Sequence, residues 1–195
     1  GGTNISISGE DTVVNANGGK YGAGIGGGAM GAGENITISD GAHVTANGGA
    51  QGAGIGGGNG YDGDVTISGN AKIENATGGY GAAGIGGGAF SSPDKIGNGN
   101  VVIKDNAKID NVQGGAYGAG IGGGIYGLSN VTIEGNTKVN ATGGAGGAAI
   151  GGGAGAENNS DNNGNQITIK SNENGSPTIL SLIHISEPTR HSLLS

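Results

Sequence analysis

The chain has 195 residues, of which 51 are glycine, and it contains no cysteine. Ordering so much glycine is entropically costly, so a compact globule around one interdigitated core is not expected. The net charge of −7 argues against nucleic acid or an anionic membrane surface as a partner, and the lack of cysteine excludes disulfides and thiolate metal sites. No apolar run reaches the length of about 18 residues that spans a bilayer, so we expect no membrane insertion.

A glycine-rich string recurs along the chain, and its central isoleucines are 30, 30, 36 and 29 residues apart. Between the strings lie segments such as NITIS at 35–39 and HVTAN at 43–47, in which apolar and polar residues alternate. This alternation with β-branched residues is typical of strands, and a fixed period of roughly 20–50 residues is typical of a solenoid. The string reads GAGIGGG at 22–28, 52–58 and 118–124, AAGIGGG at 82–88 and GAAIGGG at 147–153.

Each repeat predicts three short strands, which suit one coil of a right-handed parallel β-helix. The fold class is therefore all-β, a β-solenoid of five to six coils with about 30 residues each, forming a rod of roughly 25 Å. In the glycine-rich strand we expect a bare outer face at Gly24, Gly26 and Gly28. Stacking would align the first apolar residue of each first strand, namely Ile5, Ile36, Val65, Val101, Val131 and Ile167.

The first string contains Gly22-x-Gly24-x-x-Gly27, the glycine spacing of a dinucleotide-binding loop. Such a loop needs a strand before it, a helix after it and an acidic residue about twenty positions further on. Here the string recurs in every repeat and is followed by another strand pattern. We therefore interpret the glycines as architectural, and we expect no bound cofactor.

Catalytic groups are sparse, because His43 is the only histidine before position 180 and no arginine or cysteine occurs there. Glu74 and Asp110 occupy matching places in KIEN and KIDN. A lysine, Lys72 or Lys108, stands two residues before each of them, which favours a surface charge ladder over a catalytic carboxylate pair. We expect no enzymatic activity, with a fragment of a β-helix polysaccharide-degrading enzyme as an alternative.

One segment invites a metal interpretation. GGNGYD at 57–62 fits the first six positions of a nonapeptide calcium repeat, in which aspartates and backbone carbonyls bind Ca²⁺ between turns. Asp62 and Asp64 are therefore the candidate metal ligands. Asp64 stands where that repeat has an apolar residue, and no second copy follows, so a chain without Ca²⁺ is the main expectation.

Large side chains flank the glycine strings in two partial columns, one just before the string and one two residues after its triple glycine. Aromatic faces together with hydroxyl and amide groups suit polysaccharides, so the aromatic residues of these columns are candidates for stacking against a glycan. Covering the core at coil corners is the alternative role. The first column contains Tyr21, Tyr80 and Tyr117, and the second contains Met30, Phe90 and Tyr126.

The repeat pattern stops near Ile179, and the following residues Leu180–Arg190, LSLIHISEPTR, resemble the translation of a tagmentation sequencing adapter. The resemblance implies that residues 180–195 are an adapter-derived, disordered tail on a solenoid of residues 1–179. It also implies a metagenomic or shotgun source and a natural chain that continues. A genuine capping segment is the alternative, since solenoids need caps.

Whole repeats such as NITISDGAHVTANGGAQGAGIGGG (35–58) resemble glycine-rich β-helix repeats of large secreted or wall-attached proteins of Gram-positive bacteria. The resemblance covers about residues 1–179. It implies an extracellular or cell-surface location and a non-catalytic, adhesin-like or carbohydrate-binding role within a larger chain, with a polysaccharide or host glycan as partner. A passive structural stalk is the alternative.

Overall fold

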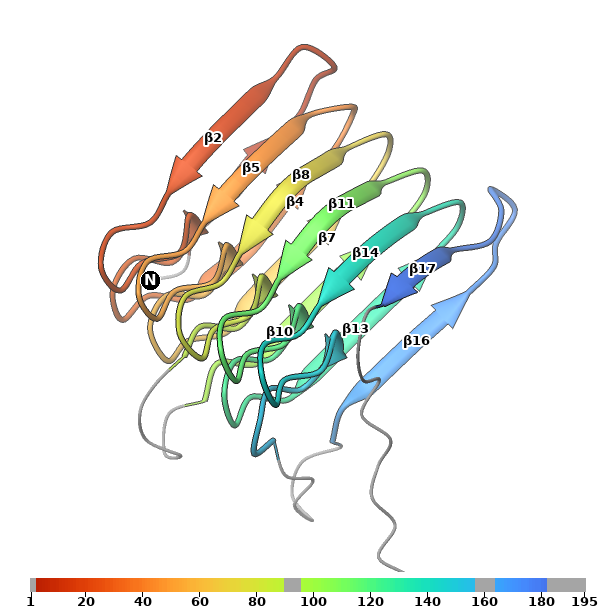
Figure 1. The fold of residues 1–195 in the computed structure, drawn as a ribbon. Coiled ribbons are helices and arrows are strands. Elements are labelled where there is room, and N and C mark those ends of the chain that lie inside the picture. Colours follow the sequence, from red (N-terminus) through yellow and green to blue (C-terminus); the bar gives the residue numbers. More distant parts are fainter. Residues whose placement is uncertain (1–2, 90–95, 157–163, 182–195) are drawn as a thin grey trace, which may run out of the picture.

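The computed structural model describes residues 3–89, 96–156 and 164–181. These residues form 17 strands and no helix, wound as a right-handed parallel β-helix whose coils stack from the N-terminal to the C-terminal end (Figure 1). The predicted all-β solenoid is confirmed.

Each coil contributes one strand to each of three parallel sheets, which contain six, six and five strands. The first sheet consists of β1 (Ile5–Ile7), β4 (Gly33–Ile38), β7 (Gly63–Ile67), β10 (Gly99–Ile103), β13 (Ser129–Glu134) and β16 (Gln166–Lys170). The second consists of β2 (Val13–Asn17), β5 (His43–Asn47), β8 (Lys72–Thr77), β11 (Lys108–Gln113), β14 (Lys138–Thr142) and β17 (Thr178–Ser181). The third consists of β3 (Ile25–Gly26), β6 (Ile55–Gly56), β9 (Ile85–Gly86), β12 (Ile121–Gly122) and β15 (Ile150–Gly151).

The core consists of columns of apolar side chains that run along the rod. Since successive strand residues face opposite sides, every second side chain points inward and meets its equivalent one coil away. The column predicted from the first strands is present, with each member paired in register to the next. The isoleucines of the third sheet form a second column, namely Ile25, Ile55, Ile85, Ile121 and Ile150.

The glycines of the third sheet allow close stacking of the backbone. Gly86 has a φ of +128°, and a Cβ placed there would lie 2.1 Å from the Gly122 carbonyl oxygen. The predicted bare outer face is wrong at Gly24 and Gly26, because a Cβ would lie 2.8 Å from the Gly54 oxygen at the first and 2.0 Å from the Gly56 oxygen at the second. It holds at Gly28, where a Cβ would have no neighbour within 4 Å.

The repeat with the longest spacing keeps its register. β10 pairs with β7 and β13 without a shift, so its additional residues fall between Ala89 and Ile96. At the other end β17 pairs with β14 as far as Ser181, two residues beyond the predicted solenoid boundary. The remainder of the adapter-like segment, from residue 182 onward, lies outside the described residues.

Candidate functional site

Two turns per coil form one edge of the rod, on either side of the short third-sheet strand. In the first coil they span residues 19–22 and 28–31, and an N–H···O=C bond of 2.9 Å closes each. Turns of successive coils are also joined, since the Asn59 N–H donates to the Tyr21 carbonyl at 2.9 Å. The two predicted aromatic columns therefore run along the same edge.

Four tyrosines are exposed on this edge, and we call Tyr21, Tyr80, Tyr117 and Tyr126 the tyrosine edge. Their exposed fractions are 39%, 60%, 40% and 37%, respectively. The rings of Tyr80 and Tyr117 meet edge to face, with centroids 5.6 Å apart and planes at 75°. The Lys20 ammonium lies 5.0 Å from the Tyr21 ring centroid, within cation–π range. Phe90, predicted for the same surface, lies outside the described residues.

Two of these tyrosines have a backbone conformation that favours glycine. Tyr117 has a φ of 71° and Tyr126 a φ of 62°, each at the third position of its turn. A left-handed conformation costs an L-residue about 1–2 kcal/mol. Some other coils carry glycine with positive φ at these places, namely Gly81 and Gly146 for the first turn and Gly60 and Gly155 for the second, whereas Tyr21 and Gln51 hold the first-turn place without a positive φ.

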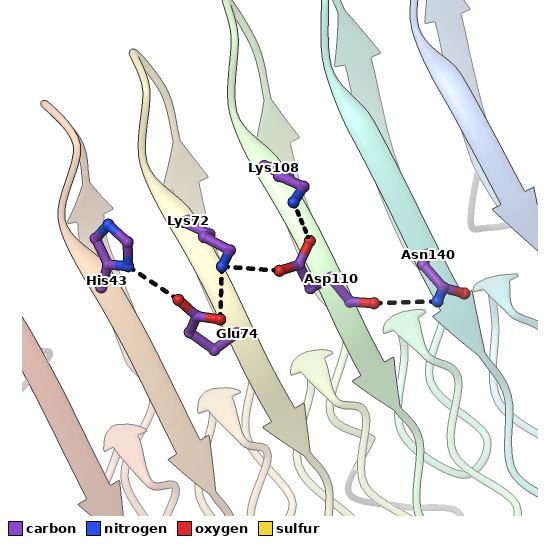
Figure 2. Close-up of polar contacts among 6 residues, drawn as sticks. All are labelled: His43, Lys72, Glu74, Lys108, Asp110 and Asn140. Carbon is purple, nitrogen blue, oxygen red and sulfur yellow. Dashed lines mark hydrogen bonds and ion pairs between the residues drawn. The ribbon is translucent and has the colours of Figure 1, made fainter.

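A charged network crosses three coils of the second sheet (Figure 2). Its centre is Lys72, whose ammonium lies 2.7 Å from Glu74 and 3.1 Å from Asp110. Lys108 lies 3.0 Å from the other oxygen of Asp110, and the His43 Nδ1 lies 2.9 Å from Glu74. The predicted charge ladder is therefore present, and it also includes His43, for which the sequence suggested no partner.

These contacts shift the ionisation of the network in favour of its charged forms. Hydrogen bonds from Lys72 and then from His43 lower the pKa of Glu74. Burial raises the pKa of Asp110, but the hydrogen bonds from Lys108 and Lys72 outweigh it and leave the pKa below its usual value. Hydrogen bonds to both carboxylates raise the pKa of Lys72. Neither carboxylate is thus tuned toward the neutral form that a general acid needs near neutral pH.

Matched bulges place the two carboxylates on this surface. The pairing of β5 with β8 shifts after Val44, and that of β11 with β14 shifts after Ile109, so β8 and β11 each contain one residue more than their outer neighbours. As a result two consecutive residues point outward in each strand, and none of them is buried. They are Glu74 and Asn75 in β8, and Asp110 and Asn111 in β11. Bulges often reorient side chains in this way.

An amide ladder runs along the same sheet. Asn47 donates to Asn17 at 3.0 Å, Asn75 donates to Asn47 at 3.1 Å, and Asn111 donates to Asn75 at 2.7 Å. Asn140 donates instead to the Asp110 backbone carbonyl at 3.0 Å (Figure 2). The outer surface of the second sheet is therefore polar and internally bonded over five coils.

The predicted calcium ligands lie at a polar groove beside the first sheet. One oxygen of Asp62 accepts the Asn98 N–H at 2.7 Å and so caps the backbone of the next coil. Burial is the main cause that raises the pKa of Asp62, and the negative charge of Asp64 adds to it. Among the described residues, no group of three or more His, Asp or Glu side chains is arranged to hold a metal ion. A Ca²⁺ site at Asp62 and Asp64 stays a prediction.

The chain matches the beta helix repeat family in four segments, residues 5–29, 36–59, 65–89 and 131–154. Together these segments make up just over half of the chain. The chain belongs to this family. No curated protein and no solved structure matches this β-helix repeat chain. No helix that could cross a membrane occurs in the described part of the chain.

The β-helix repeat assignment accounts for the core and leaves the surface to be interpreted. The sequence placed four described tyrosines on coil corners, and the structure brings them onto one edge. The contact of His43 with Glu74 was missed, because the partners are 31 residues apart. The bulges were missed too, although a signal was available: the inward residues Ile73 and Ala76 are three apart instead of two.

Proposed function

We propose that this β-helix repeat chain is a non-catalytic, carbohydrate-binding region of an extracellular or cell-surface protein, and that the tyrosine edge is its binding surface. The stacked coils would present this edge as a rigid strip. We propose binding without catalysis, because the two carboxylates at matching places in neighbouring coils, Glu74 and Asp110, are held as lysine-paired anions.

The observation that carries the proposal is the placement of exposed tyrosines at strained positions. Tyr117 and Tyr126 have positive φ values at places where two equivalent turns each use glycine. Both side chains remain more than one-third exposed, so burial of the rings returns only part of the strain energy. Strain kept at an exposed aromatic residue suggests a role outside folding.

A saccharide chain is the ligand class that suits this strip. The C–H face of a sugar ring packs against an aromatic ring, while phenol hydroxyls hydrogen-bond to sugar hydroxyls. Tyr21 and Tyr117 are three coils apart, which is roughly 14 Å at the spacing of parallel strands. That length accommodates several sugar residues.

The proposal is tested by a glycan-array screen of the chain, followed by titration of the best hit against three variants. Tyr80→Ala/Tyr117→Ala should abolish binding, and Tyr80→Phe/Tyr117→Phe should retain most of it because the ring faces remain. Val13→Ala is the matched control, since it truncates a 68% exposed apolar side chain in β2, on another surface. Circular dichroism verifies that every variant is folded.

The outcomes separate the alternatives. A blank array from a folded sample would refute carbohydrate binding and leave the chain as a passive stalk. Release of new reducing ends from a bound polysaccharide would indicate a fragment of a degrading enzyme. Loss of binding in chelator would point to Ca²⁺ at Asp62 and Asp64.

A further inference from the structure

A groove of about 440 Å³ runs beside the first sheet over four coils, and it is separate from the exposed rings of the tyrosine edge. Its volume lies within the roughly 300–1,000 Å³ that is usual for ligand sites. Most of its lining is polar, and the apolar exceptions are Ile96 and Leu128. It thus combines hydrogen-bonding groups with a small apolar surface.

One row of side chains gives the groove its repeat. Asp64, Asn100, Asn130 and Gln166 stand in register at the start of successive first-sheet strands, and all four line the groove. Strands in a sheet are roughly 4.8 Å apart, so the row spans roughly 14 Å. This rise per coil is close to the length of one pyranose unit in an extended polysaccharide.

The groove members of this row differ from those outside it. In the first two coils the equivalent residues bond to each other, since the Asn35 amide donates to Asn4 at 3.0 Å. Within the described part of the chain, no hydrogen bond joins the amides of Asn100, Asn130 or Gln166 to another residue. Each of these amides can both donate to and accept from a ligand hydroxyl.

The charge of the groove limits which saccharide it can take. Its described lining contains two carboxylates, Asp62 and Asp64, and no lysine, arginine or histidine. Glu34 adds further negative charge close to Asp62. A uronic acid polymer would bring its carboxylates against these groups, with no cation in the described lining to neutralise them.

We propose that this groove is a second saccharide site, which binds an extended chain of neutral or amino-bearing sugars along the rod and rejects uronic acid polymers. Amides of the row contact ring hydroxyls, and Asp64 accepts a hydrogen bond from a hydroxyl or an ammonium group. Ile96 and Leu128 cover an apolar face of the sugar. This site goes beyond the tyrosine edge and does not depend on it.

Calorimetric titration of the chain with tetramers of glucose, glucosamine and galacturonic acid tests the proposal. The first two should bind at least about tenfold more tightly than the uronate. Tighter binding of glucosamine than glucose would assign an ionic role to Asp64, and Asp64→Asn should then equalise the two. Equal or tighter binding of the uronate, or no binding of either other tetramer, would overturn the proposal.

Variants distinguish this site from the tyrosine edge. Asn100→Ala/Asn130→Ala should weaken tetramer binding by about tenfold or more. Asn4→Ala, in the same row but outside the groove, is the matched control and should bind as the unmodified chain does. If Tyr80→Ala/Tyr117→Ala abolishes tetramer binding and the asparagine variant does not, the groove proposal fails while the tyrosine edge stands. The converse result refutes only the tyrosine edge.

Discussion

Replacing Gly86 with alanine should lower the stability of the solenoid far more than replacing Gly28, the last glycine of the first string, with alanine. Gly86 has a φ of +128°, which an L-residue adopts at a cost of about 1–3 kcal/mol. The added Cβ would also lie 2.1 Å from the Gly122 oxygen, so the two coils must separate locally. That oxygen accepts the Gly87 N–H at 2.9 Å, and the adjacent Ile85 N–H donates to Gly120 at 3.0 Å.

The magnitude follows from these contacts. Weakening two inter-coil hydrogen bonds costs about 0.5–1.5 kcal/mol each, so strain and bond loss together amount to about 2–6 kcal/mol. Such a loss is a large part of the roughly 5–15 kcal/mol that stabilises a typical domain. At Gly28 a Cβ meets nothing within 4 Å, and Gly28→Ala should change stability by less than about 1 kcal/mol.

Urea unfolding followed by far-ultraviolet circular dichroism measures both variants against the unmodified chain. Equal free energies of unfolding for Gly86→Ala and Gly28→Ala would refute the argument that close coil stacking requires glycine at position 86. The string would then need another explanation.

Three further predictions concern the core, the charged network and the turns. Ile103→Ala removes a fully buried side chain and should lower the free energy of unfolding by about 2–5 kcal/mol in urea titrations; a loss below about 1 kcal/mol would contradict the packed core. Because the network lowers the pKa of Glu74, this carboxylate stabilises the folded chain fully at a pH above its ordinary pKa of 4.5. That stabilisation is lost as the pH falls through the lower pKa of the folded state. At neutral pH the melting temperature of Glu74→Gln should therefore lie below that of the unmodified chain, and the two should converge in acid or in high salt. A difference that persists in acid would exclude the ion pairs as its cause. Met30 has a φ of 59° and is 70% exposed, so Met30→Gly should be more stable than Met30→Val by about 1–2 kcal/mol in thermal melts. Equal stability of the two variants would show that residue 30 does not keep this left-handed conformation in solution.

The repeat and the inward columns could be predicted from the sequence because both follow from local periodicity. Alternation in NITIS assigns Ile36 and Ile38 to one side whatever the rest of the chain does. A spacing of about 30 residues then superimposes equivalent residues. The tyrosines of the tyrosine edge could be located at coil corners for the same reason, since each lies within two residues of a glycine string.

Contacts between coils could be recognised only in the tertiary structure. His43 and Glu74, or Lys72 and Asp110, become neighbours because the coils stack with His43, Lys72 and Lys108 in register. The left-handed backbone of Tyr117 likewise depends on how its turn closes against the next coil, where its carbonyl accepts the Ala154 N–H at 2.8 Å. Local pattern thus determined which residues face inward, because side-chain direction alternates along a strand. The outer surface was decided by coil register and turn geometry, because its interacting side chains are 30 to 36 residues apart and meet only when the coils stack.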